Sequence, residues 1–152
     1  MRSKFAFEYA LLGTVGLSMA LPASARAMLP MNTPTNVHGV SSVCTGIGYT
    51  EEHNPDWKPY PLKVVVAGKE GQYLSGSDIS ISHGGKSVAE MHCDGPWVLL
   101  KLSPGRYRIT ADRNGKSESG IAYAPDSGQG RIILRFRDQG GAVSTQYLHS
   151  LG

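Results

Sequence analysis

The stretch that decides the fold is Asp94-Gly95-Pro96-Trp97-Val98-Leu99-Leu100-Lys101-Leu102-Ser103-Pro104-Gly105-Arg106-Tyr107-Arg108-Ile109-Thr110-Ala111. It predicts a turn, a strand, a second turn and a second strand. The second turn forms at Pro104-Gly105, because proline fixes φ at a turn position and glycine tolerates positive φ. After it, polar and apolar side chains alternate, as they do in a half-buried strand. The stretch therefore indicates a small all-β domain.

Turn signals at regular intervals extend this pattern along the chain. Gly84-Gly85 and Asn114-Gly115 are typical of two-residue hairpin turns, and no helical period follows the N-terminal region. Seven strands are predicted, at residues 62–67, 72–82, 86–93, 97–102, 106–112, 116–124 and 131–137. We interpret residues 62–138 as a seven-stranded antiparallel β-sandwich. Its strand order stays open between immunoglobulin-like and transthyretin-like.

The segments on either side of this domain lack its periodicity. Residues 28–61 are interpreted as a lead-in segment, mobile from Met28 to about Val40, followed by a Pro-rich loop. The prolines of Glu51–Pro61 argue against a helix or a central strand there. Residues 43–49 fit either a short strand or an irregular segment. Residues 139–152 are predicted to be a flexible polar tail.

Several segments occur in an informative order. Val43-Cys44-Thr45-Gly46-Ile47-Gly48 is followed by Tyr73–Ile81, Gly84-Gly85, Asp94–Trp97 and Leu102–Ile109. In this combination they resemble the carboxypeptidase regulatory-like domain family, and more narrowly its exported bacterial single-domain members. The resemblance covers residues 43–137. It implies a transthyretin-like sandwich of seven strands and no activity, because the domain is itself non-catalytic in that family.

The N-terminus predicts export. Arg2 and Lys4 precede an uncharged apolar run, Tyr9 to Leu21, which is shorter than the roughly 20 residues that span a membrane. We interpret residues 1–27 as a signal peptide cleaved after Ala27, with cleavage after Ala25 as the alternative. A periplasmic or secreted location follows, with no transmembrane span after processing.

The charge of the exported part is small. Residues 1–27 carry three positive charges and one negative charge, so the net charge falls from +3 to +1 on processing. A balance this close to neutral gives no reason to expect a nucleic-acid partner.

The two cysteines, Cys44 and Cys93, are predicted to form a disulfide. An isolated even pair in an exported chain is typical of a structural bridge. A metal or redox role is the alternative, and the neighbouring His92, with His83 across the hairpin, raises the possibility of copper. Adjacent side chains on a strand point to opposite faces, which argues against convergence of His92 and Cys93. No cofactor or metal is predicted.

Two surfaces are candidates for binding. Trp57 and Tyr60 in the Pro-rich loop, together with Trp97, predict a pocket with an apolar or carbohydrate-stacking surface. A basic stripe of arginines on outward strand faces is the second candidate, provided that the fifth and seventh predicted strands are neighbours. Its members are Arg106, Arg108, Arg131, Arg135 and Arg137. A solvated strand face is the alternative interpretation of the same residues.

No motif carries a reaction. Serines and histidines are scattered without a nucleophile elbow. Transthyretin-like hydroxyisourate hydrolases carry a C-terminal Tyr-Arg-Gly-Ser motif, whereas this chain ends in Tyr147-Leu148-His149-Ser150-Leu151-Gly152. We therefore expect a non-catalytic exported binding or structural module whose partner is another envelope protein or polymer. A small periplasmic copper protein and a transthyretin-like hydrolase are the alternatives. Its oligomeric state has no signature in the sequence.

Overall fold

The chain folds into two β-sheets with little helix. The computed structural model describes Gly16 and residues 26–137. Its strands are β1 (Ala27–Met28), β2 (Thr35–Val37), β3 (Val40–Thr45), β4 (Leu62–Gly68), β5 (Ser77–His83), β6 (Lys86–Cys93), β7 (Trp97–Leu100), β8 (Gly105–Arg113), β9 (Lys116–Ala124) and β10 (Gly130–Phe136). Helical structure among these residues is limited to α1 (Tyr49–Glu52) and the 3₁₀ turn η1 (Pro55–Trp57), and neither could cross a membrane.

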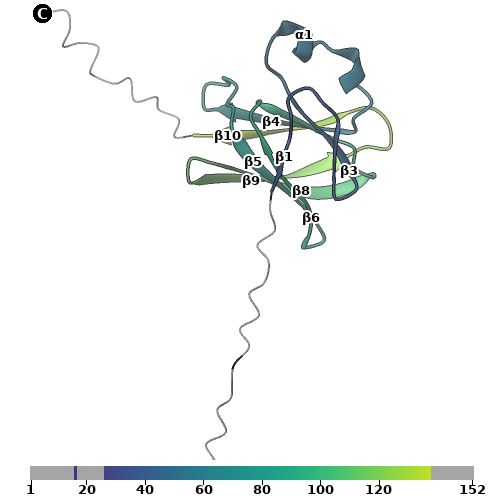
Figure 1. Ribbon diagram of the computed structural model, residues 1–152, viewed down its shortest axis with the longest axis vertical. Helices are drawn as coiled ribbons and strands as arrows, with labels where there is room; N and C mark the ends of the chain where they lie inside the picture. The colour runs from purple at the N-terminus through teal and green to yellow at the C-terminus, as the bar shows by residue number, and fades with distance from the viewer. Residues whose placement is uncertain (1–15, 17–25, 138–152) are drawn as a thin grey trace, which may run out of the picture.

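The two sheets enclose one main core. The first sheet has the order β1-β6-β5-β8-β9 and the second β10-β4-β7-β3-β2, with α1 and its loop on the side of the second sheet (Figure 1). Because side chains alternate along a strand, Leu62, Val64 and Val66 of β4 point into the core and are fully or almost fully buried. Lys63 and Val65 lie on the outer face of the second sheet, where the candidate site forms.

The seven predicted strands are present as β4 to β10, but two details of the prediction were wrong. The described residues form ten strands rather than seven, and the sheets are mixed rather than antiparallel. β10 runs parallel to β4, and β1 runs parallel to β6. A parallel pair needs a long crossover instead of a hairpin, and five strands separate β4 from β10. Local turn signals therefore carried no information about that pairing.

The predicted lead-in is part of both sheets: it supplies Met28 of β1 and the whole of β2 and β3. Leu29, Val37 and Val40 are buried in the main core. The amide of Leu29 also donates to the carbonyl of His92 at 3.0 Å. Its prolines and asparagines interrupt any period, so the sequence did not reveal that its scattered apolar side chains are buried. Among the residues left open between strand and loop, 43–45 belong to β3 and 46–48 are irregular.

The Pro-rich loop contains α1 and η1, so the expectation that it holds no helix was wrong. The side chain of Asn54 accepts a hydrogen bond from the amide of Asp56 at 2.9 Å and caps η1. Pro55 stands in the first turn of η1, where a missing N–H leaves no helical hydrogen bond unmade. Prolines are thus compatible with a single helical turn at this place.

The predicted disulfide is confirmed between Cys44 of β3 and Cys93 of β6, with 5.4 Å between their Cα atoms. These strands belong to different sheets. The bridge therefore fastens one sheet to the other across the core, and it consumes both of the cysteines in the chain.

A small ionic network holds β1 against β6. The guanidinium of Arg26 lies 2.7 Å from one oxygen of Asp78. His92 Nδ1 lies 2.7 Å from the other Asp78 oxygen, and His92 Nε2 lies 2.9 Å from Asp94. The hydrogen bond to Asp78, with a further one to Asp94, raises the pKa of His92 although partial burial opposes the shift. The imidazolium form therefore binds both carboxylates.

This network predicts a stability that decreases as the pH rises. Because the pKa of His92 is higher in the folded state than its ordinary value of 6.5, the contribution is complete below about pH 6.5 and is lost as the pH rises through the folded-state pKa. Thermal melts across this pH range give the slope of the melting temperature against pH. His92→Asn should flatten it, whereas His38→Asn at an exposed turn should not. An unchanged slope in His92→Asn would refute the role of this histidine.

Candidate functional site

A second, smaller core lies on the outer face of the second sheet, beneath the loop that holds α1 and η1. Val43 and Leu99 are paired in register on β3 and β7, so they share this face. They pack with Trp57 and Tyr60 of the loop, and all four are buried. The side-chain amide of Gln129 donates to the carbonyls of Trp57 and Tyr60 at 2.8 and 3.0 Å. These contacts fix the loop on the sheet.

A pocket of about 280 Å³ opens beside this second core. Trp57 and Trp97 both line it, and they are 8% and 4% exposed. Each indole N–H is buried and has no acceptor among the described residues, an arrangement that costs free energy. The lining residues, which define what we call the tryptophan pocket, are Glu52, His53, Asn54, Trp57, Lys58, Lys63, Trp97, Leu99 and Gln129.

Lys63 supplies positive charge in the tryptophan pocket. Its Nζ lies 3.1 Å from the centroid of the Trp97 ring, so the cation is held by the π-face of the indole. Burial lowers the pKa of Lys63, the charge of Arg131 lowers it further, and Glu52 acts in the opposite direction. No carboxylate of the described residues forms an ion pair with Lys63. An anionic group in the pocket would raise the pKa of Lys63 and so oppose both of these effects.

The structure brings the three aromatic residues of the predicted binding surface to one region, but not as open rings. Trp57 packs edge-on against Tyr60, and Trp97 receives the edge of Tyr73 and the ammonium of Lys63. Because both indoles are more than nine-tenths buried, neither has a free face for a sugar ring to stack on. The polar and charged side chains of the pocket lining, such as Asn54 and Lys63, are therefore the binding elements that this arrangement offers.

The predicted basic stripe is divided between the two sheets. Arg106 and Arg108 lie on β8 in the first sheet, whereas Arg131, Arg135 and Arg137 lie on or directly after β10 in the second. The condition that these strands are neighbours was wrong, because β10 pairs with β4. The stripe therefore does not exist as one surface.

The β10 arginines acquire a different cationic neighbour, Lys63, which sequence reasoning missed. Arg131 is paired in register with Lys63, so both side chains lie on the outer face of the second sheet. The alternation of Leu62, Val64 and Val66 already placed Lys63 opposite the core. What the sequence lacked was the identity of the neighbouring strand.

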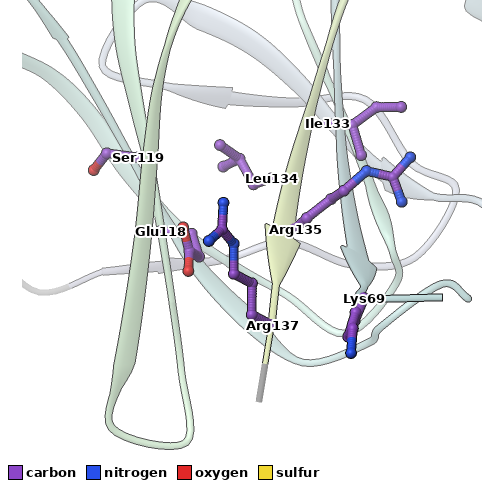
Figure 2. Close-up of a pocket in the computed structure, with 7 residues that line it drawn as sticks. All are labelled: Lys69, Glu118, Ser119, Ile133, Leu134, Arg135 and Arg137. Atoms are coloured by element: carbon purple, nitrogen blue, oxygen red, sulfur yellow. The ribbon is translucent and has the colours of Figure 1, made fainter. Parts of the chain in front are cut away.

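A second cavity, of about 640 Å³, lies at the seam between β9 and β10, the edge strands of the two sheets. Figure 2 shows Arg137 extending toward Glu118 of β9, with Arg135 on the other side of β10. An Arg135 guanidinium nitrogen lies near Gly71, in the turn after β4. The lining residues of this seam cavity are Lys69, Glu118, Ser119, Ile133, Leu134, Arg135 and Arg137. With three cations and one carboxylate, the lining of the seam cavity has a net positive charge.

The described residues that suggested copper chemistry do not form a metal centre, and the C-terminal residues 147–152 that were compared with the hydrolase motif lie outside the described residues. Cys93 is in the disulfide, and both ring nitrogens of His92 contact carboxylates. Among the described residues no group of three or more metal-ligand side chains converges. His83 lies in a third cavity, where its Nδ1 is 2.8 Å from the carbonyl of Arg106 and its ring contacts Tyr107. No acidic side chain lines that cavity.

Comparisons with known proteins give limited information. No protein-family model matches the chain, and no curated protein matches it. Among solved structures, the chain is similar to 5-hydroxyisourate hydrolase from Klebsiella pneumoniae, with 13% sequence identity and a TM-score of 0.39, over 50% of this chain and 83% of that one. An overlap of this extent transfers neither a fold family nor an activity, so the function has to be argued from the site.

Proposed function

We propose that this protein is an exported, non-catalytic binding module of the cell envelope whose ligand enters the tryptophan pocket. The observation that carries the proposal is the pair of buried indole N–H groups, from Trp57 and Trp97, that lack acceptors beside the cation Lys63. Buried donors without a partner are rare in folded proteins, and a pocket that combines apolar walls with a few polar groups is the usual form of a binding site. The partner is an envelope protein or polymer.

We also propose that the fold is a transthyretin-like sandwich of the carboxypeptidase regulatory-like type, extended by β1 to β3. It is supported by the seven predicted strands of residues 62–138, present as β4 to β10, and by the motif resemblance over residues 43–137. Domains of that family are non-catalytic. The pocket here is lined mainly by aromatic, amide and lysine side chains together with Glu52, and its His53 is bound through Nδ1 to the carbonyl of Tyr49. Hydrolysis remains the competing function, and turnover assays address it below.

Export is supported by the apolar N-terminal run and by the disulfide. We expect the exported protein to begin at Arg26. Arg26 binds Asp78, and Ala27 pairs with Met91 in β1, so cleavage after Ala25 retains both contacts and cleavage after Ala27 removes both. The intact mass of protein purified from the periplasm or medium distinguishes the two sites. A chain that begins at Met28 would contradict this expectation.

Tryptophan fluorescence tests the binding function directly, because the chain has two tryptophans and both line the tryptophan pocket. The exported protein is titrated with chito-oligosaccharide, inorganic polyphosphate, polygalacturonate and polyglutamate. A saturable change in emission with any one of these probes, without turnover in ester, peptide, glycoside and hydroxyisourate assays, supports the proposal. Lys63→Met should weaken the change, whereas Lys86→Met on the other sheet should not. Turnover, or a flat titration with all four probes, would refute it.

A further inference from the structure

The outer face of the second sheet carries a row of cations along β10. Arg131 and Arg135 alternate with inward side chains and are exposed on this face, whereas Arg137, which follows the strand and is also exposed, extends toward Glu118 at the seam (Figure 2). At about 3.3 Å per residue, Arg131 lies about 13 Å from Arg135 along the strand, and Arg137 lies about 7 Å further on. Lys63 stands beside Arg131 in register. We call Lys63, Arg131, Arg135 and Arg137 the β10 track.

The β10 track carries an excess of positive charge within the part of the chain that the structure describes. Within the described residues, the ion pairs are those of Arg26 and His92, and none involves the track. Glu52 acts on Lys63, and Glu118 lines the seam cavity together with Arg135 and Arg137. The lowered pKa of Lys63, caused by burial and then by Arg131, agrees with an uncompensated cluster of like charges. Four cations against two carboxylates leave the track positive.

The tryptophan pocket and the seam cavity lie at opposite ends of the β10 track. The tryptophan pocket includes Lys63 and Gln129, at the start of β10. The seam cavity includes Arg135 and Arg137, at its end, together with Lys69 (Figure 2). Between the two cavities, the exposed arginines lie along the single strand β10. A ligand that follows β10 therefore reaches both cavities.

We propose that the β10 track binds a linear polyanion, a chain with repeated phosphate or carboxylate groups, that runs along β10 from the tryptophan pocket to the seam cavity. This inference rests on the proposed binding function and names the class of its ligand. Lys63 then binds a charged group of the polymer at the tryptophan pocket, and the arginines bind further groups at intervals along the strand.

The geometry favours a chain over a single anion or a folded partner. Guanidinium groups spaced along a strand do not converge on one point, so one small anion would contact one or two of them. A folded protein partner needs an apolar interface centre, and the large apolar side chains that are exposed in the described part of the molecule lie outside β10. They are Met28, Ile47, Tyr49, Tyr73 and Tyr123.

Binding to polymers of defined chemistry tests the inference. Inorganic polyphosphate and polygalacturonate are titrated against the exported protein at fixed ionic strength, with orthophosphate, chito-oligosaccharide and polyglutamate as comparisons. Saturable binding of either polyanion, weakened by added salt, is expected, and the preferred one identifies phosphate or carboxylate as the charged group. The triple variant R131Q/R135Q/R137Q should bind it at least about tenfold more weakly, since each exposed charge contributes a fraction of the binding free energy.

A matched control removes the same charge from the other sheet. Lys86, Arg106 and Arg108 are exposed on β6 and β8, so K86Q/R106Q/R108Q should bind within about threefold of the unchanged protein. Thermal melts establish that both variants fold. Equal losses in the two variants, or orthophosphate binding as tight as polymer binding, would overturn the inference, whereas saturable binding of polyglutamate, itself a linear polycarboxylate, supports it. Binding of chito-oligosaccharide alone would overturn it while leaving the proposed binding function intact.

Discussion

The double variant C44A/C93A is expected to lose roughly 4 kcal/mol of unfolding free energy, because the bridge closes a loop with a sequence separation of 49 residues. A loss of this size lowers the melting temperature by roughly 15 °C for a domain of this length. The native bridge joins β3 to β6, so its removal also eliminates this covalent link between the two sheets. Urea unfolding under oxidising conditions measures the difference.

The reduced form of the unchanged protein is the control for this prediction. It should unfold at nearly the same denaturant concentration as the double variant. Each single variant, C44A or C93A, should lose almost as much unfolding free energy as the double variant, because either substitution removes the same bond. A loss below about 1 kcal/mol in the double variant would contradict a stabilising role for the bridge.

Gly46→Ala is the second substitution with a large expected effect, and Gly48→Ala is its matched control. Both glycines have positive φ, of 96° and 95°, and an alanine there costs about 1–2 kcal/mol. A Cβ at Gly46 would lie 2.6 Å from Cγ of Trp97, whereas one at Gly48 meets nothing within 4 Å. Displacing a buried ring adds about 1–3 kcal/mol.

We therefore expect Gly46→Ala to cost about 4 kcal/mol and Gly48→Ala less than half as much. Urea unfolding gives the free energies. Tryptophan emission should shift in Gly46→Ala and stay unchanged in Gly48→Ala, because the first substitution moves Trp97 in the tryptophan pocket and the second does not. Equal costs in the two variants would show that backbone conformation alone requires glycine at residue 46.

Local chemistry made a large part of the fold predictable. Asn114-Gly115 predicted a hairpin, and β8 and β9 meet at that turn, where Asn114 and Gly115 both have positive φ. The strands flanking Pro104-Gly105 are likewise present. Such features were predictable because turn chemistry and side-chain alternation act between residues close in sequence. The disulfide was predictable because two cysteines allow one pairing.

What the sequence did not reveal depends on contacts between distant segments. β10 pairs with β4, and this pairing decides which cations share a face. It separates Arg131 from Arg106 and places it beside Lys63. The burial of Trp57 and Trp97 likewise depends on how the α1 loop folds back on the outer sheet face. The aromatic residues of the site were therefore predictable, and their orientation and charged neighbours were not.

The central claim is that ligands bind on the outer face of the second sheet, from the tryptophan pocket along β10. Amide chemical-shift mapping of the ¹⁵N-labelled exported protein, titrated with inorganic polyphosphate and then polygalacturonate, tests it most directly. The account predicts shifts of the two indole N–H signals, from Trp57 and Trp97, and of backbone amides in β4 and β10. Shifts confined to β5, β8 and β9 of the first sheet, with both indole signals unchanged, would contradict it.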